Sequence, residues 1–316
     1  MKKGLLFVCM AILVTLIGFT SCEKDPPSAG FTYVAEGFTV TFTSVVTNTD
    51  SYTWDFGDGG TSTEANPVYA YTEAGEYEVT LTATGPGGTD SRVQTLTISP
   101  SAEDLKNMLS GGAAATNGKT WVLNRIYNAQ TDGGSAVDPG MFLFVGLADN
   151  VLDLIGMGSE YDNEFTFYHD GSYEVDLVND TALTATLFGF YGGEVLLYTM
   201  ENNLYGLNKS SYTAPESSTW TFHQEDLVVD AVLNPLDTLV PAVHANVTFS
   251  GMNWVSLSEG AYFGVLDFPT TRKFIIKSIT NESLNVALFV CAYWADPAGS
   301  GNLPTWLYHL TFVPKE

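Results

Sequence analysis

Positive charge is scarce in this sequence. The chain has 12 Lys and Arg against 36 Asp and Glu, a formal net charge of −24. Removing Lys2 and Lys3 with the leader predicted below leaves 10 basic against 36 acidic residues, or −26. Such a surface repels polyanions, which excludes nucleic acid and anionic lipid surfaces as partners and disfavours acidic polysaccharides. Neutral sugars remain compatible with it.

Cysteine is also scarce, and the common catalytic motifs are missing. Of the 3 cysteines, Cys9 lies in the predicted leader and Cys22 directly follows it, so Cys291 has no partner for an internal disulfide. Cys291 ends the apolar run 286–291 and is expected to be a small buried side chain rather than a nucleophile. The 4 His show no paired metal spacing, and no zinc motif, phosphate-binding glycine loop or Gly-x-Ser-x-Gly turn occurs. The pattern predicts a protein without cofactor or catalytic function.

The amino terminus predicts export. A basic start at residues 1–3 precedes an apolar run over 5–19 and then Thr20-Ser21-Cys22. This pattern is typical of a secretory signal peptide, here residues 1–21. The segment resembles the lipobox of bacterial lipoproteins, although Phe19 stands where leucine is usual. That resemblance implies a lipid on Cys22, whereas ordinary cleavage would leave Cys22 without a role. Glu23-Lys24-Asp25 resembles the acidic signal that directs Bacteroidetes lipoproteins to the outer face of the cell outer membrane.

A strand and turn over residues 52–60 predict the first domain. Tyr52, Trp54 and Phe56 alternate with polar residues, as on a strand with one buried face, and Gly57-Asp58-Gly59-Gly60 ends it in a tight turn. This run, followed by Asn66-Pro67-Val68-Tyr69-Ala70-Tyr71 and Gly75-Glu76-Tyr77-Glu78-Val79, resembles the polycystic-kidney-disease (PKD) module, an immunoglobulin-like β-sandwich. The resemblance implies a spacer domain over 31–99, after a tether at 22–30, with strands near 31–35, 38–43, 51–56, 76–84 and 91–98.

The rest of the chain predicts a second all-β domain. Ser101–Asp104 reads as a capping box, which predicts one short helix within a linker over 100–118. Residues 119–316 then show short alternating segments, which favour an antiparallel sandwich of jelly-roll type or, alternatively, a lipocalin-like barrel. The predicted strands cover 119–123, 164–168, 172–177, 219–222, 246–249, 273–277, 283–294 and 306–312, with a hairpin at Asp170-Gly171 and another at Asn281-Glu282. Lys119-Thr120-Trp121, residues 161–167, Ser218-Thr219-Trp220 and Thr305–Tyr308 resemble the domain that follows PKD modules in Bacteroidetes surface glycan-binding lipoproteins.

Two tryptophans near the carboxy terminus are the first candidate ligand-binding residues. Trp294 and Trp306 flank a polar loop rich in Gly and Pro, with Asp296 and Asn302 between them. Aromatic rings can stack on the C–H faces of sugars, while carboxylates and amides bind the hydroxyls. The alternative is that both rings complete the core. Trp254 with Tyr262 forms a second, weaker candidate cluster.

Glu160, Asp162 and Glu164 are the strongest enzymatic signal. On a strand they would share one face, as in the Glu-x-Asp-x-Glu of laminarinase-type retaining glycosidases, which the segment resembles. Asn163 stands where those enzymes carry an apolar residue, so the alternative is a polar strand edge or turn. A calcium site using Asp162, Glu164 or Asp170 is a further alternative, although no loop has calcium-binding spacing.

Residues 141–158 and 183–198 are unusually apolar. They are expected to be core, or else to dock another envelope protein or line a cavity for a lipid-like ligand. The interpretation of the whole sequence is non-catalytic capture of a neutral polysaccharide, with β-glucan as the first expectation. The resemblance implies transfer of that glycan to a porin-type outer-membrane importer and its partner lipoprotein.

Overall fold

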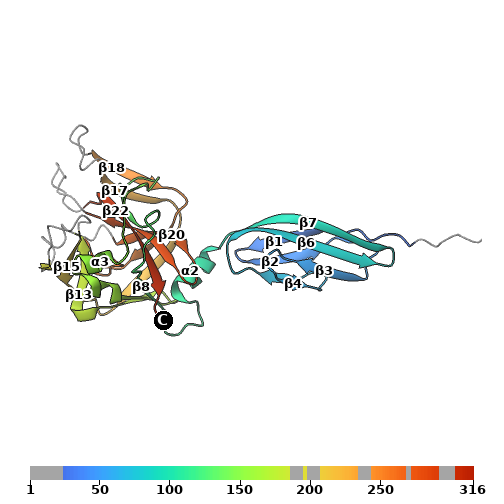
Figure 1. The fold of residues 1–316 in the computed structure, drawn as a ribbon, viewed down its shortest axis with the longest axis horizontal. Helices are drawn as coiled ribbons and strands as arrows, with labels where there is room; N and C mark the ends of the chain where they lie inside the picture. The colour runs from blue at the N-terminus through green and yellow to red at the C-terminus, as the bar shows by residue number, and fades with distance from the viewer. Residues whose placement is uncertain (1–23, 186–194, 198–206, 234–242, 268–271, 292–302) are drawn as a thin grey trace, which may run out of the picture. The chain divides into compact units, whose positions relative to one another are not determined.

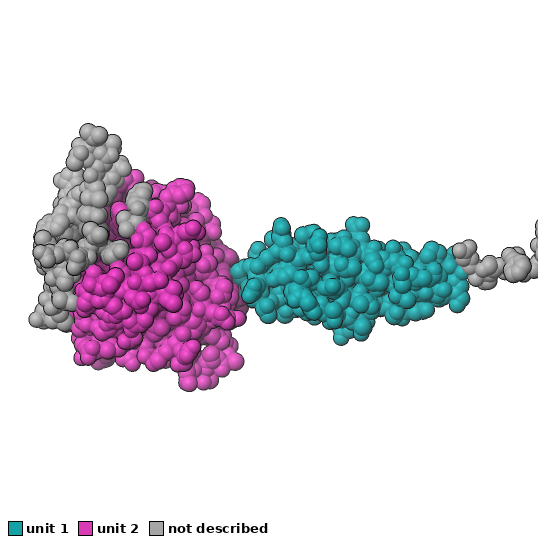
Figure 2. Space-filling view, in the orientation of Figure 1, with its two compact units in different colours: residues 1–101 teal, residues 102–316 magenta. Residues whose placement is uncertain are grey.

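The computed structural model describes residues 24–185, 195–197, 207–233, 243–267, 272–291 and 303–316. It divides into two compact units at Ser101 (Figure 2). Within the described ranges, no helix is long and apolar enough to cross a membrane.

The first unit consists of two antiparallel sheets packed around aromatic side chains. One sheet contains β1 (Phe31–Glu36), β2 (Thr39–Ser44) and β5 (Val68–Ala70). The other contains β4 (Thr61–Ser62), β3 (Ser51–Asp55), β6 (Gly75–Gly85) and β7 (Gly88–Ile98). Trp54 and Phe56 are completely buried between the sheets. The predicted immunoglobulin-like sandwich and its five strands are confirmed.

The turn after β3 requires a glycine at position 57. Gly57 has a φ of +85°, and a Cβ there would lie 2.8 Å from the carbonyl oxygen of Glu78. Only glycine fits without strain, because L residues disfavour positive φ and the backbone of β6 passes too closely. The Trp54 indole donates to the Glu64 carbonyl at 2.8 Å, which fixes the strand against the next turn.

The second unit is built around a closed antiparallel barrel (Figure 1). Eight strands follow one another around the ring in chain order: β8 (Lys119–Leu123), β11 (Glu164–Phe167), β12 (Ser172–Asp176), β16 (Ser218–Gln224), β19 (Asn253–Leu257), β20 (Lys273–Ile279), β21 (Leu284–Val290) and β22 (Trp306–Pro314). The second half of β22 pairs with β8, with Phe312 opposite Leu123, and this pairing closes the ring. The all-β class is confirmed, and the architecture is the barrel alternative rather than the jelly-roll sandwich.

Additional strands extend the barrel. The first half of β22 pairs with β9 (Gly133–Ser135), which pairs with β10 (Leu143–Gly146). Strands β13 (Thr181–Ala185), β15 (Leu207–Ser211) and β14 (Val195–Leu197) form a small separate sheet. The hairpin of β17 (Leu227–Leu233) and β18 (Val243–Phe249) covers the outer face of β19–β22 and forms a second core there. Short helices α3 (Val151–Leu154), η1 (Gly158–Asp162) and η2 (Val178–Asp180) lie in the connections.

The barrel interior is filled by a side chain from the β19–β20 connection. The Phe263 ring stacks on Phe312 at 4.2 Å and on Phe274 at 4.7 Å, and it meets Phe165 edge-on at 5.1 Å. Gly264 follows with a φ of +68°, and a Cβ there would lie 2.7 Å from the Phe312 ring. Among the described residues, the interior therefore leaves no room for the lipid-like ligand that the barrel alternative implied.

Helix α2 (Ala102–Ser110) closes one end of the barrel. Leu105 and Leu109 are buried, the Trp121 indole donates to the Leu109 carbonyl at 2.8 Å, and the Lys119 ammonium donates to the Met108 carbonyl at 2.9 Å. The predicted helix forms, but it belongs to the second unit instead of lying in a linker. Four longer connections leave the barrel at the opposite end, at 124–163, 177–217, 258–272 and 291–305.

The apolar stretch 141–158 is core only in part. Val151, Leu152, Ile155 and Met157 are buried, whereas Phe142 and Leu154 are 76% and 71% exposed. In the stretch 183–198, Leu183 and Ala185 are buried, but most of its remaining residues lie outside the described ranges.

Candidate functional site

Trp306 lies at the loop-bearing end of the barrel. It is the first residue of β22 and pairs with Val290, the last residue of β21. Its indole lies against Gly134 of β9, where a Cβ would come within 2.7 Å of the ring atom Cζ2. Because only glycine leaves that space, the indole packs directly on the β9 backbone and against the core, while part of the ring stays exposed.

The base of the Trp294–Trp306 loop is well defined. The Thr305 amide donates to the Val290 carbonyl at 3.0 Å, and the Val232 amide of the outer hairpin donates to the Pro304 carbonyl at 2.9 Å. Trp294, Asp296 and Asn302 lie outside the described residues. Their convergence with Trp306 therefore stays a prediction.

Trp254 and Tyr262 are located in the cores, contrary to the expectation of a second sugar-contacting cluster. Trp254 is 7% exposed and stacks on the His223 ring at 3.8 Å and 9°, beneath the outer hairpin. Tyr262 is 4% exposed, and its ring meets Phe165 at 5.5 Å and Tyr212 at 4.9 Å. The glycines around residues 258–264 predict a surface loop, but the loop folds back into the barrel, where its rings bury more apolar area.

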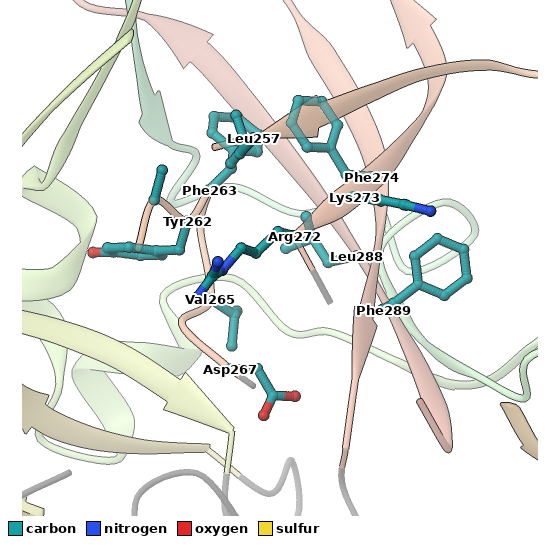
Figure 3. A pocket seen from close by; sticks show the side chains of 11 residues that line it. Leu257, Tyr262, Phe263, Val265, Asp267, Arg272, Lys273, Phe274, Leu288 and Phe289 are labelled. Carbon is teal, nitrogen blue, oxygen red and sulfur yellow. The ribbon is translucent and has the colours of Figure 1, made fainter. Parts of the chain in front are cut away.

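A small cavity lies among these residues at the loop-bearing end (Figure 3). Its volume is about 10 Å³. Figure 3 shows Arg272 extending toward Tyr262 and Val265, with the Asp267 carboxylate at the edge of the group. That space holds about one water molecule, so it is a packing defect rather than a ligand pocket.

Glu160, Asp162 and Glu164 point to different partners, which corrects the shared-face expectation. Residues 158–162 form the 3₁₀ helix η1 rather than a strand, so the period-2 argument does not apply to them. Glu160 is 2% exposed and ion-paired with Lys209 at 2.9 Å. Asp162 pairs with Arg125 at 3.1 Å, and Glu164 pairs with Lys315. The described residues therefore contain no pair of facing carboxylates here of the kind that a retaining glycosidase uses.

The Glu160 carboxylate is held by a buried network. It accepts hydrogen bonds from the Thr181 hydroxyl at 2.9 Å and the Asn163 amide at 2.8 Å, in addition to the Lys209 ammonium. This network joins η1 to β13 and β15, so its role is to hold the connections together. Asp170 accepts from the Ser172 amide at 2.9 Å in the β11–β12 turn, and the described part of the chain has no group of three His, Cys, Asp or Glu side chains placed to hold a metal ion.

A polar pocket on the outer wall of the barrel was not predicted. It has a volume of about 240 Å³. Its lining residues come from the connection after β8 and from β20, β21 and β22: Asn124, Ile126, Asn128, Thr131, Asp132, Ser278, Ser283, Asn285 and Thr311. Sequence reasoning missed them because they are ordinary polar residues from distant segments. The alternation of Asn285 and Thr311 with apolar neighbours marks them as outward-facing, but only the fold brings them together.

Comparison with known proteins identifies the first unit. It is an immunoglobulin-like β-sandwich, and residues 25–100 match the PKD domain family and form a PKD domain. The metalloprotease PrtV of Vibrio cholerae is 40% identical over 90 residues, and collagenase ColA of Bacillus cereus is 56% identical over 45 residues. These matches span 27% and 14% of this chain but only 10% and 5% of those proteins.

Two solved structures were also found to be similar to this chain. The PKD1 domain of PrtV is 42% identical, covers 24% of this chain and 99% of its own, and has a TM-score of 0.23. A carbohydrate-binding module of the β-sandwich superfamily aligns over 93% of this chain and 94% of its own with 14% identity and a TM-score of 0.24. A likeness that weak carries no argument about the second unit.

Proposed function

We propose that this protein captures a neutral polysaccharide at the cell surface without cleaving it. In this proposal a lipid on Cys22 anchors the chain to the outer membrane, and the PKD domain acts as a spacer. The second unit binds the glycan, with β-glucan as the first ligand to test, for uptake by a porin-type importer and its partner lipoprotein.

The observation that carries the proposal is the position of Trp306. A ring held on Gly134 at the mouth of a barrel, where several loops end, is a rigid apolar surface next to polar side chains. Stacking on it costs little conformational entropy because the indole is already fixed. Trp294, Asp296 and Asn302 would complete the surface as a second ring and two hydroxyl partners.

Charge and packing support the same class of ligand. The net charge of −24 repels acidic glycans, and the filled barrel disfavours a lipid inside the described part of the unit. The separation of Glu160 from Asp162 and Glu164 supports binding without hydrolysis. One exposed site of this kind binds in the millimolar to micromolar range, about −4 to −8 kcal/mol.

Affinity electrophoresis tests the proposal. Residues 23–316, and the variants Trp306→Ala and Trp294→Ala, are run through gels that contain laminarin, other neutral glycans or acidic glycans. We expect retardation by a neutral glycan that weakens in both variants, with no shortening of the glycan chains. Tyr33→Ala, which removes a 39% exposed ring from the PKD domain, is the control.

Full retardation of both folded tryptophan variants would refute the role of the loop. Free migration through every gel would refute glycan capture itself. Chain shortening would instead establish a hydrolase.

A further inference from the structure

We propose that the polar pocket on the outer wall of the barrel binds one neutral sugar residue, as a site separate from the loop around Trp306. The ligand class rests on the proposed function, but the site rests on its own geometry. It lies on the outer faces of β20–β22, nearer the helix-capped end than Trp306, which begins β22 at the opposite end.

A buried carboxylate forms the floor of the pocket. Asp132 is 1% exposed, and its Oδ1 accepts from the Thr311 hydroxyl at 2.7 Å and the Asn285 amide at 3.1 Å. Its Oδ2 accepts from the Asn128 backbone amide at 2.9 Å. Three segments of the chain are thereby fixed around one charged group, which makes the pocket rigid before any ligand enters.

The connection after β8 folds tightly over this floor. The Asn285 amide donates to both Asp132 and the Thr311 hydroxyl, the latter at 2.8 Å, so its orientation is fixed. The Lys277 ammonium donates to the Thr131 carbonyl at 2.9 Å, which holds the connection to β20. Polar side chains that are fixed in this way can select a ligand by the positions of its hydroxyls.

The lining chemistry favours a neutral, hydroxyl-rich ligand. Apart from Asp132 and Ile126, the lining side chains are Asn, Ser and Thr, which donate and accept hydrogen bonds without carrying charge. The Asp132 carboxylate repels an anionic sugar, and the Lys277 ammonium nearby offsets the attraction for a free cation. A ligand with many hydroxyls and no charge is compatible with this lining.

The rim provides an apolar contact next to the polar lining. Ile126 is 68% exposed although it lines the pocket. A pyranose ring has weakly apolar C–H faces and a polar edge, so it would contact Ile126 with one face while its hydroxyls reach the Asn, Ser and Thr groups.

The volume limits the ligand to a single ring. The pocket volume is about 240 Å³. It is below the ~300–1,000 Å³ that drug-sized ligands require. We therefore expect one residue of a glycan, or a free monosaccharide, to fill the pocket.

The test measures binding of free glucose, galactose, mannose and xylose to residues 23–316 by saturation-transfer NMR and titration. Ser278→Tyr fills the pocket from an exposed strand position, and Ile126→Ala removes the rim contact. Ser172→Tyr and Val228→Ala make the same changes at exposed positions of β12 and β17 outside the pocket. We expect at least one of the four sugars to bind, with a tenfold or larger loss in Ser278→Tyr, a smaller loss in Ile126→Ala, and none in either control.

Wild-type binding in Ser278→Tyr, or no transfer from any of the four sugars, would overturn the wall site. The Trp306→Ala variant separates this result from the proposed function. If Trp306→Ala abolishes gel retardation while Ser278→Tyr changes neither measurement, glycan capture stands and the wall pocket is only hydrated surface. If Ser278→Tyr loses monosaccharide binding and Trp306→Ala keeps it, the wall pocket is a sugar site of its own.

Discussion

At the scale of single residues, Glu160 holds the connections of the second unit together. Its side chain is completely buried and ion-paired with Lys209, which is itself 16% exposed. The hydrogen bonds from Thr181 and Asn163 satisfy the remaining acceptor positions of the carboxylate. These partners stabilise the buried charge, and removal of any one of them destabilises the folded state.

We therefore expect Lys209→Met to destabilise the second unit by about 3 kcal/mol, because it leaves a buried carboxylate without its countercharge. Urea unfolding followed by tryptophan fluorescence measures this, since every tryptophan except Trp54 belongs to the second unit. Adding Glu160→Gln to the Lys209→Met variant should recover part of the loss. A loss below about 1 kcal/mol, as for exposed ion pairs, would contradict the buried-network interpretation.

His309 supplies a pH-dependent contribution to stability. It is fully buried on β22, and its Nε2 lies 2.7 Å from the Ser135 hydroxyl. Burial, with a smaller contribution from the Lys277 charge, lowers the pKa of His309 to about 3. The folded state therefore binds no proton on this ring at pH values where the unfolded chain, with a pKa near 6.5, already does.

The unfolded state binds more protons between pH 6.5 and about 3, so stability falls as the pH drops through that window. For one ring the slope approaches about 1.4 kcal/mol per pH unit. We expect His309→Gln to remove that slope when unfolding is measured between pH 7.5 and 5.0, above the range where carboxylates titrate. Burial also lowers the pKa of His223, but this residue is present in both proteins. Only the difference between the two pH profiles therefore reports on His309. Parallel pH profiles would contradict the prediction.

At the scale of secondary-structure elements, alternation predicted most strands but not their closure into a barrel. Residues 164–167, 172–176 and 306–314 form strands close to the expected limits, and both predicted hairpin turns occur. Whether the second unit is a barrel or a sandwich depends on whether β22 pairs with β8, which lies almost 200 residues earlier in the chain. The periodicity of the sequence carries no information on such a pairing. The position of Phe263 inside the barrel was not predicted for a related reason. The Gly and Ser residues around it are typical of a surface loop.

The candidate site was predictable only in part. Trp306 was correctly expected at the start of a strand beside a long connection, because polar and Gly/Pro residues precede it. Trp254 and Tyr262 were misplaced, since aromatic residues near turns are equally common in cores. Asp132 of the wall pocket offered no local signal, because Asn285 and Thr311 reach it from distant strands.

Helix α2 is the element whose assignment changed most. Leu109 is completely buried, and the Leu109 carbonyl accepts from the Trp121 indole. We expect Leu109→Ala to destabilise the second unit by about 2–5 kcal/mol, the usual range for a buried leucine. Met108→Ala, on a less buried side chain of the same helix, is the matched control and should cost less.

Truncation tests the same assignment directly. A chain that begins at residue 100 should show cooperative unfolding, whereas one that begins at residue 113 should be markedly less stable, because the barrel end and the Trp121 indole lose their cover. Equal stability of the two truncated chains would show that α2 belongs to the linker instead of the second unit.

At the scale of the whole molecule, the PKD domain and the second unit have separate cores. The exposed aromatic residues of the PKD domain are few. Its compact sandwich, between a predicted lipid site and the proposed binding unit, fits a spacer that increases the reach of that unit from the membrane. In the proposed function, anchoring also raises the local concentration of binding sites, which compensates for the weak single-site affinity expected there.

The predicted lipid anchor is therefore the whole-molecule feature on which the proposed glycan capture depends most. We expect Cys22→Ser to leave folding and gel retardation unchanged, because Cys22 precedes the PKD domain at residues 25–100, but to release the protein from the membrane fraction. Detergent partitioning of expressed wild type and variant measures the change, and Cys291→Ser, at a buried thiol, is the control for loss of a cysteine. Cells that express Cys22→Ser should then retain little polysaccharide. The released chains lose avidity, although each binding site keeps its affinity. Membrane retention of Cys22→Ser would show that something other than a lipid on this cysteine holds the protein at the membrane.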